Sequence, residues 1–527
     1  MADLDRNIQK TARQRFDLII IGGGIHGVML ALEASLRNVK TLLIEQHDYG
    51  AHTSYNSLRI LHGGFRYLQN FDLRRLYESA RERFWYFNFF PELTHALPSL
   101  MPLYGNGLRR PQILGPALKA YDVLTGSIRN GANCQQIIPT GRMLGAKETI
   151  NQCCFFPEKG LQGGAVWYDG FIPDTQRLLI GALRWGCEYG LQALNYVRAT
   201  DIVKHRGKTV GLLVQDEETN SEYQFDCELV VNAAGPWCRD VATHFDQDEP
   251  LLFHSMLAWN VLFNRPAISH YATAVSSPGP LGRMYFIVPW KGMMFAGTGH
   301  APWRNHSRDP HPTREQLNRF CSDLNHTLPG IDLEENDIIH VFAGLQSAKK
   351  EGGTDFAKRD VYVRHADMGG PEGLHSISGI KFTTARKVAE KTIHRLFPAM
   401  KNNEGSLHSL FPPPPDATRK AGIYDFNWSP VQGARQWKEE LAELILKEAV
   451  VHLDDLILRR TSLGDNPARA MSLAPTTCGL FDWNNTRKHQ EIERLHNHFQ
   501  FLQGNAISMT ISSPDDLMIS NQQERSS

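Results

Sequence analysis

Two apolar runs separated by a glycine turn and a helical stretch dominate the start of the chain. Residues 16–21 read Phe-Asp-Leu-Ile-Ile-Ile, and residues 41–44 read Thr-Leu-Leu-Ile. Between them lie three consecutive glycines, 22–24, and a stretch of helical character to about Arg37. Short apolar runs bounded by turn residues are typical of buried strands. The pattern therefore predicts strand, glycine turn, helix and strand.

Further along the chain the pattern alternates between helices and strands. Helices are predicted from Asp72 to about Phe90, before Pro91, and from residue 173 to about 189, capped by Asp174 or Thr175. Alternating apolar signals through 257–300 predict an antiparallel sheet inserted beside this N-terminal unit. Further strand signals occupy 195–203, 209–215 and 229–232, residues 374–394 return to strand, turn and helix, and 100–170 is loop-rich.

The end of the chain has a different character. Four prolines at 412–415 predict a stiff, extended linker. Helices are expected over 431–460 and 484–500, followed by a polar tail without structure. The predicted domains are a flexible lead-in (1–15), a large domain with an interleaved subdomain (16–400), a Pro-rich linker (401–416), a C-terminal helical domain (417–505) and a disordered tail (506–527).

Composition narrows the class of protein. The chain has 527 residues, 42% of them hydrophobic, and its 56 basic residues balance 56 acidic ones, which argues against a nucleic-acid partner. Eight cysteines without a C-x-x-C motif favour a reduced, cytoplasmic compartment. No apolar run reaches 18 residues, and the polar start is unlike a secretory signal. The aromatic stretch 84–90 could dip into a membrane, but a buried helix is favoured.

The glycine turn carries the first chemical signal. Gly22, Gly24 and Gly27 meet the spacing G-x-G-x-x-G, and Glu45 follows the second strand. In such a unit the glycines allow a tight turn, close approach of a pyrophosphate and helix packing, while the acid binds a ribose hydroxyl. A helix N-terminus favours phosphate. The complete unit favours a dinucleotide-binding site over the alternative of a purely structural, glycine-rich turn.

Other candidate chemistry is weaker. His300, His306 and His311 fall close together, but without a carboxylate partner they are better interpreted as ordinary polar residues than as metal ligands. No metal site is predicted.

Three distant motifs point to a family. Thr53, Ser54 and Ser57 precede Leu-His-Gly-Gly-Phe-Arg-Tyr at 61–67, residues 230–237 read Val-Val-Asn-Ala-Ala-Gly-Pro-Trp, and 378–384 read Ser-Gly-Ile-Lys-Phe-Thr-Thr. With the N-terminal unit they resemble the FAD-dependent glycerol-3-phosphate dehydrogenase family, among the D-amino-acid-oxidase-like flavoproteins. The resemblance extends to 453–464, which is similar to the family's C-terminal helical domain. It implies an α/β fold, with a Rossmann-like FAD-binding domain, an inserted antiparallel-sheet substrate domain and a C-terminal helical domain.

The resemblance also implies how FAD is held. The 53–64 loop is expected near the isoalloxazine, 232–236 near the pyrophosphate, and Val197 beside the adenine. The turn at 379–381 precedes a helix whose dipole, with Lys381, would stabilise negative charge on the flavin. The predicted cofactor-binding residues are Gly22, Gly24, Ile25, Gly27, Glu45, Thr53, Ser54, Ser57, His62, Gly63, Gly64, Val197, Ala234, Gly235, Gly379, Lys381, Phe382 and Thr383.

For catalysis the resemblance implies Arg66, Tyr67, Arg359 and Lys381, with His300 as a candidate base. An arginine fork suits an oxyanion such as phosphate. A structural ion pair is the alternative for Arg66, and a surface position the alternative for Lys381. His62 could equally make a structural hydrogen bond.

The substrate side departs from the family pattern. Gln346 stands where an arginine is usual, Asn260 where a histidine is usual, and Gly-Thr-Gly-His at 297–300 replaces Gly-Thr-Thr-Asp. The flavin motifs are intact while the substrate motifs have changed. Glycerol 3-phosphate is therefore expected to be a poor substrate or not the true one.

Together these features predict an FAD-dependent oxidoreductase. It would oxidise a hydroxyl-bearing carbon by hydride transfer to flavin and pass electrons to a quinone or another acceptor. The alternatives are an oxidase or dehydrogenase of another small anionic hydroxy acid or amine, and a non-catalytic flavin-binding protein. A homodimer and peripheral contact with the inner face of the membrane stay open.

Overall fold

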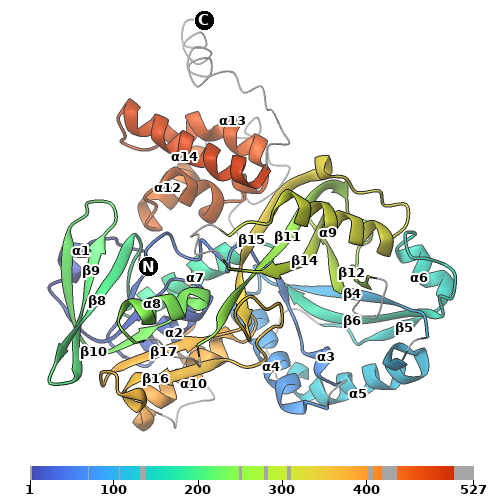
Figure 1. Ribbon diagram of the computed structural model, residues 1–527, viewed down its shortest axis with the longest axis horizontal. Coiled ribbons are helices and arrows are strands. Elements are labelled where there is room, and N and C mark those ends of the chain that lie inside the picture. Colours follow the sequence, from blue (N-terminus) through green and yellow to red (C-terminus); the bar gives the residue numbers. More distant parts are fainter. Residues whose placement is uncertain are drawn as a thin grey trace, which may run out of the picture.

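The computed structural model describes residues 3–503 except 69–70, 106, 131–137, 248–251, 278–282, 305–309, 401–406 and 418–435. Two large sheets lie next to each other, and the C-terminal helices sit above them, at the top of Figure 1. The predicted tail and residues 431–435 lie outside the described residues. None of the helices described is long and apolar enough to cross a bilayer.

The first sheet is built on the predicted N-terminal unit. Strand β1 pairs in parallel with β2 on one side and β10 on the other, with Ile20 opposite Leu43 and Val231. Helices α2, α7 and α10 pack together over one face and bury Leu18 and Ile20, while Ile19 is buried on the other face against β9 and β10. The parallel strands, in spatial order, are β7 (Gln192–Leu194), β2 (Thr41–Ile44), β1 (Arg15–Ile21), β10 (Glu222–Asn232) and β17 (Leu374–Ser378). The antiparallel additions are β16 (Val361–Arg364), β9 (Lys208–Asp216) and β8 (Val197–His205). The covering helices are α2 (Ile25–Ser35), α7 (Thr175–Glu188) and α10 (Ala385–Leu396).

The second sheet confirms the predicted antiparallel insertion, although β12 and β4 pair in parallel. Its spatial order is β15 (Ile338–Ala348), β11 (His254–Pro266), β14 (Met293–Pro302), β13 (Met284–Trp290), β12 (Ala272–Ser276), β4 (His95–Leu103), β6 (Gly163–Phe171) and β3 (Ile60–Leu61), with β5 (Arg142–Leu144) beside β6. The helices associated with it are α3 (Phe65–Leu68), α4 (Leu73–Phe89), α5 (Pro111–Asn130), α6 (Ala146–Gln152) and α9 (Arg314–Thr327).

The expectation of a loop-rich stretch at 100–170 is wrong. This stretch holds the end of β4, helices α5 and α6, and strands β5 and β6. Prolines hide the pattern, because Pro98 and Pro102 lie within β4 and Pro116 lies within α5. Proline removes a backbone donor and so argues against both kinds of element when only the sequence is considered.

Helix α4 settles the two interpretations of the aromatic stretch. Asp72 caps the helix by accepting a hydrogen bond from the Arg75 N–H. Tyr86 and Phe87 are fully buried, and the ring of Trp85 stacks on Trp185 with centroids 6.0 Å apart. The stretch is a buried helix, as the sequence analysis favours.

The lead-in and the segment before the proline run are both anchored. The Leu4 N–H donates to the Lys447 carbonyl at 2.9 Å, and Arg6 Nε donates to the Asn195 carbonyl at 3.0 Å. The predicted loose lead-in is therefore packed against the rest of the molecule. The proline segment is packed as well, because Trp185 Nε1 donates to the Phe411 carbonyl at 2.9 Å.

The predicted helix over 431–460 is interrupted. Helix α12 (Gln436–Lys447) ends before Ala449, whose φ of +50° leaves the helical region, and a π-helix follows at Asp455–Arg460. Helices α13 (Pro467–Cys478) and α14 (Asn485–Gln503) complete the region, and α14 matches the prediction for 484–500. The remaining short helices are α1 (Ile8–Thr11), α8 (Cys238–His244) and α11 (Leu407–Leu410).

Candidate functional site

A cavity of about 220 Å³ lies at the carboxyl ends of β1, β2 and β10. Open parallel sheets bind ligands at this edge. The second sheet closes the far side through residues 345–347 of β15. The two halves are joined there, since Thr53 Oγ1 donates to the Leu345 carbonyl at 2.8 Å and Ser347 Oγ donates to the Gly379 carbonyl at 3.3 Å.

Most of the predicted cofactor residues line this cavity. They come from five segments that are far apart in the sequence. Those in the wall are Gly22, Gly24, Ile25, Glu45, Thr53, Ser54, Ser57, Val197, Ala234, Gly235, Gly379, Lys381 and Phe382.

The glycines of the turn differ in what limits them. Gly22 has φ +112°, and a Cβ there would lie 2.8 Å from the Ala233 carbonyl oxygen. A Cβ at Gly27 would lie 1.8 Å from the Gly22 carbonyl oxygen, so this glycine serves helix packing. A Cβ at Gly24 would meet only Ser54 Oγ, at 3.4 Å, which is ordinary contact. Gly24 therefore leaves space on the cavity side that the protein itself does not need.

Glu45 lies at the end of β2 where a ribose-binding acid is expected. Its carboxylate accepts the Gly23 N–H at 2.6 Å and the His47 N–H at 2.9 Å. Burial raises its pKa, and these two donors oppose that shift. The Val197 N–H donates to the Glu45 carbonyl at 2.8 Å, which holds β8 against the same end of the cavity.

The wall fits the expected FAD. Ser54 Oγ accepts the Ile25 N–H at 2.9 Å, and so holds the 53–57 segment at the N-terminus of α2. The buried atoms His26 Nε2 and Ser57 Oγ have no hydrogen-bond partner among the described residues, although both residues line the cavity. Two buried polar atoms without protein partners suit a polar ligand. When FAD is bound, these wall residues would hold it.

Five predicted cofactor residues are outside the cavity wall, and their role as FAD contacts stays a prediction. Gly27 packs on Gly22, and Thr383 is buried before α10. The turn at 62–64 is held by protein contacts: the Gly63 N–H donates to Asp169 Oδ1 at 2.7 Å, and His62 Nδ1 lies 3.2 Å from Asp169 Oδ2. This arrangement supports the structural alternative for His62 and gives Gly63 and Gly64 a structural role.

A cationic cluster forms next to the cavity. Lys381 Nζ lies 4.3 Å from the ring centroid of Tyr67, and the Arg75 guanidinium lies 4.9 Å from the same ring. Burial and, to a smaller extent, the nearby charge of Arg66 together lower the pKa of Lys381 to about 8. The structure thus brings together Lys381, Tyr67 and Arg66, which were predicted from distant motifs, and Lys381 also lines the cavity.

Arg359 lies near this cluster but is exposed. Hydrogen bonds from Arg75 are the main cause of the lowered pKa of Asp72, and the charge of Arg359 makes a smaller contribution. Arg75 Nη1 also donates to the Lys358 carbonyl at 3.3 Å, so this segment runs beside the start of α4. Its role in substrate binding stays a prediction.

His300 lies on β14, and the sheet register shows where it points. Ala258 on β11 is paired with both His300 and Gly344, and directly paired residues project from the same face. On that face a Cβ at Gly344 would lie 3.2 Å from the Cα of Thr53, a cavity residue. The two outer strands are about 10 Å apart. Burial and the charge of Arg283 lower the pKa of His300, so it is neutral near pH 7.

The substrate-side departures have different structural roles. Gln346 lies in the cavity wall, so the site itself lacks the positive charge that the usual arginine would supply. Asn260 is a brace: its Nδ2 donates to the Asn56 carbonyl at 2.9 Å, and its Oδ1 accepts from Thr298 Oγ1 at 3.0 Å. It holds the 53–57 segment against the second sheet.

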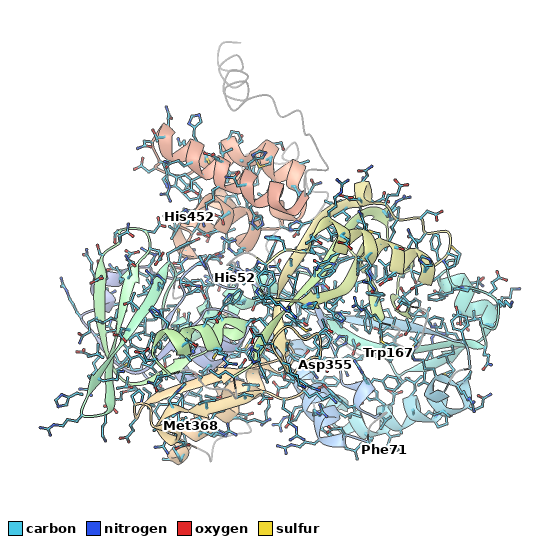
Figure 2. All side chains as sticks on the ribbon, viewed as in Figure 1. His52, Phe71, Trp167, Asp355, Met368 and His452 are labelled. Atoms are coloured by element: carbon cyan, nitrogen blue, oxygen red, sulfur yellow. The ribbon has the colours of Figure 1, made fainter. Side chains whose placement is uncertain are left out.

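The C-terminal region, which the proline linker predicts to be a separate domain, packs against a segment of the site. Arg459 Nε and Arg460 Nη1 donate to Asp48 Oδ2 at 2.6 and 2.7 Å, and all three side chains are buried. Asp48 lies between Glu45 and Gly50, which both line the cavity. Figure 2 shows His52, of the same segment, directly below the C-terminal helices.

Sequence analysis missed His52 and gave His26 no function. His52 lines the cavity with Trp237, their rings 4.7 Å apart, and burial lowers its pKa to about 3. Trp237, which contacts His52, ends the motif at 230–237, and His26 lies within the glycine turn at 22–27. Position in or next to a motif could therefore have indicated both histidines.

Comparison with known proteins agrees with this architecture. The sequence model of the family described as FAD dependent oxidoreductase matches residues 17–385. An aerobic glycerol-3-phosphate dehydrogenase of Bacillus subtilis is 29% identical over 389 residues, which covers 74% of this chain and 68% of that protein. One from Staphylococcus haemolyticus is 28% identical over 404 residues, or 76% of this chain and 71% of its own.

Solved structures share the fold. The glycerol-3-phosphate dehydrogenase from Bacillus halodurans, complexed with FAD, gives a TM-score of 0.71 at 20% identity and covers 95% of this chain and 98% of its own. The L-alpha-glycerophosphate oxidase from Mycoplasma pneumoniae, with FAD bound, gives 0.54 at 17% identity and covers 73% and 95%.

Proposed function

This chain belongs to the family of FAD-dependent oxidoreductases, and we propose that it oxidises a hydroxyl-bearing carbon of a small anionic substrate, glycerol 3-phosphate or a close relative. The observation that carries the proposal is the pair of cations on the Tyr67 ring, Lys381 and Arg75, with the charge of Arg66 close to Lys381, beside a cavity lined by the FAD-binding segments. Relatives named aerobic glycerol-3-phosphate dehydrogenase support this substrate class.

The residues divide the chemistry between them. FAD, when bound, supplies the two-electron acceptor. Lys381 would hold the anionic group, because a cation in a partly desolvated site attracts an oxyanion strongly. Arg66 is exposed and would add a second positive charge from the solvent side. Tyr67, between Lys381 and Arg75, orients the lysine through its ring face.

We assign removal of the hydroxyl proton to His300. Its lowered pKa keeps the imidazole neutral near pH 7, and a general base must be unprotonated to act. Its side chain leaves the same sheet face as Gly344, which meets the Thr53 segment of the cavity wall. His300→Gln should lower the rate of flavin reduction 10²- to 10⁴-fold, the usual contribution of general base catalysis.

A quinone is the proposed electron acceptor, reached at the inner face of a membrane. Apolar side chains support peripheral contact: Phe71 is 85% exposed and Val123 79% exposed, and both belong to the packed group α3 to α5. Figure 2 shows Phe71 at the outer edge of this group. The double variant Phe71→Ser, Val123→Ser should cosediment with anionic vesicles less than the wild type does. Wild-type protein that does not cosediment with these vesicles would contradict the proposal. The homodimer stays a prediction.

Anaerobic mixing tests the substrate directly. The absorbance of the oxidised flavin should bleach with glycerol 3-phosphate or a related polyol phosphate, and not with glycerol. Bleaching by a hydroxy acid or an amine instead would favour the second candidate function, an oxidase or dehydrogenase of such a compound. Gln346 supports that candidate, because it stands in the cavity wall where an arginine is usual. No bleaching by any of these compounds would favour a non-catalytic flavin protein.

A further inference from the structure

His26 is a half-buried histidine that the proposed reaction does not use. It is the second residue of α2, inside the glycine turn, and it lines the cavity. Its Nε2 is buried and has no hydrogen-bond partner among the residues that the structure describes. A buried nitrogen left without a partner is unfavourable, so its retention at a ligand cavity needs an explanation.

The imidazole lies directly against Gly379. A Cβ on Gly379 would come within 1.8 Å of His26 Nε2 and 2.2 Å of its Cδ2. The backbone of Gly379 is not in the left-handed region, so an alanine there would be limited by the imidazole and not by φ. His26 therefore joins the pyrophosphate turn at 22–24 to the turn at 379–382, and Lys381 is two residues further along.

The charge state of His26 suits a hydrogen bond to a ligand. Burial lowers its pKa to about 4, while the charge of Asp360 opposes the shift. The ring is therefore neutral near pH 7, and one of its two nitrogens carries a proton. A neutral imidazole can donate to a phosphate or carbonyl oxygen, or accept from an N–H, without placing a second cation beside Lys381.

We propose that His26 is a cofactor-binding residue whose Nε2 hydrogen-bonds to bound FAD between these two turns. Gly379 is a glycine because the imidazole needs that space to reach the cofactor. The alternative is a packing role, in which the ring fills the gap between α2 and Gly379 and its nitrogens contribute nothing to FAD binding.

Titration of apoprotein with FAD, followed by flavin fluorescence, separates the two roles. His26→Phe keeps a ring in the gap but removes the nitrogens, and should weaken FAD affinity roughly 10-fold, the effect of one lost buried hydrogen bond. His26→Gln, which restores a polar end group, should recover part of the loss. His340→Phe is the matched control, because burial also lowers the pKa of His340, but this residue lies outside the cavity wall.

A second pair of variants tests the geometry. Gly379→Ala should weaken FAD binding because its methyl group displaces the imidazole. Adding His26→Ala to Gly379→Ala should bring the affinity back to that of His26→Ala alone, since the steric conflict is gone. Circular dichroism of each apoprotein establishes that the variants are folded. The dissociation constant needs no substrate, so the outcome is independent of the proposed reaction.

Wild-type affinity in His26→Phe, within twofold, would overturn the proposal and leave a packing role. A double variant that binds FAD much more weakly than His26→Ala would also overturn it, because the methyl group would then act on the cofactor without the imidazole.

Discussion

Replacing Arg460 with leucine tests whether the C-terminal region holds the cofactor segment in place. Arg460 is fully buried, and its guanidinium donates to both oxygens of Asp48, at 2.7 and 2.8 Å, and to the Glu448 carbonyl at 2.9 Å. Removing one partner of a buried ion pair typically costs about 3–5 kcal/mol. Asp48 keeps its bond to Arg459, so we expect about 3 kcal/mol.

The expected loss is measurable by urea unfolding. With a slope of about 1–3 kcal/mol/M, the midpoint should fall by roughly 1–3 M. Bound flavin should also be released at lower urea than in wild type, because Asp48 lies between two cavity residues. Both changes follow from the same broken contact, so they should appear together.

A surface pair provides the control. Arg15 pairs with Glu228 at 3.0 Å, but their side chains are 71% and 68% exposed. Exposed pairs contribute about 0–1 kcal/mol, so Arg15→Leu should barely move the midpoint. An Arg460→Leu protein that unfolds like Arg15→Leu and keeps its flavin would refute the view that this buried pair couples the C-terminal region to the site.

Four further predictions address the site and the fold. Gly24→Val should give folded but colourless protein, since a Cβ there meets only Ser54 Oγ and the bulkier side chain fills the cavity side, and a yellow variant with full FAD content contradicts this. Gln346→Arg should improve the use of glycerol 3-phosphate roughly 10- to 150-fold and Arg66→Ala should damage turnover, whereas efficient wild-type turnover at micromolar substrate would oppose the weakened-site interpretation. Affinity for an anionic inhibitor should fall as pH rises through about 8, where Lys381 loses its proton, and Arg66→Gln should move this limb to higher pH; an unmoved limb argues against Lys381 as the titrating group. The pKa of His452, between the carboxylates of Glu218 and Glu491, is raised from 6.5 to about 9, so the stability it contributes is complete below about pH 6.5 and lost as pH rises through about 9, a dependence that His452→Gln should remove from thermal unfolding curves.

The sequence by itself determined the features that depend on local chain chemistry. The turn at 22–27, the acid at Glu45 and the buried helix α4 follow from residue types at fixed spacing, because backbone conformation and strand or helix periodicity act over a few residues. The family motifs extended this to most of the cavity wall.

Only the tertiary structure decided how distant segments meet. Asp48 and Arg460 are separated by 412 positions in the sequence. His26 follows β1 and Gly379 follows β17, and the two residues meet at the same edge of the sheet. The proline run at 412–415 suggested a separate domain, yet the helices beyond it bury their charges against Asp48 because an ion pair is satisfied by distance in space. Local patterns carry no information about which buried charge or which glycine will lie opposite, and that pairing is what builds this site.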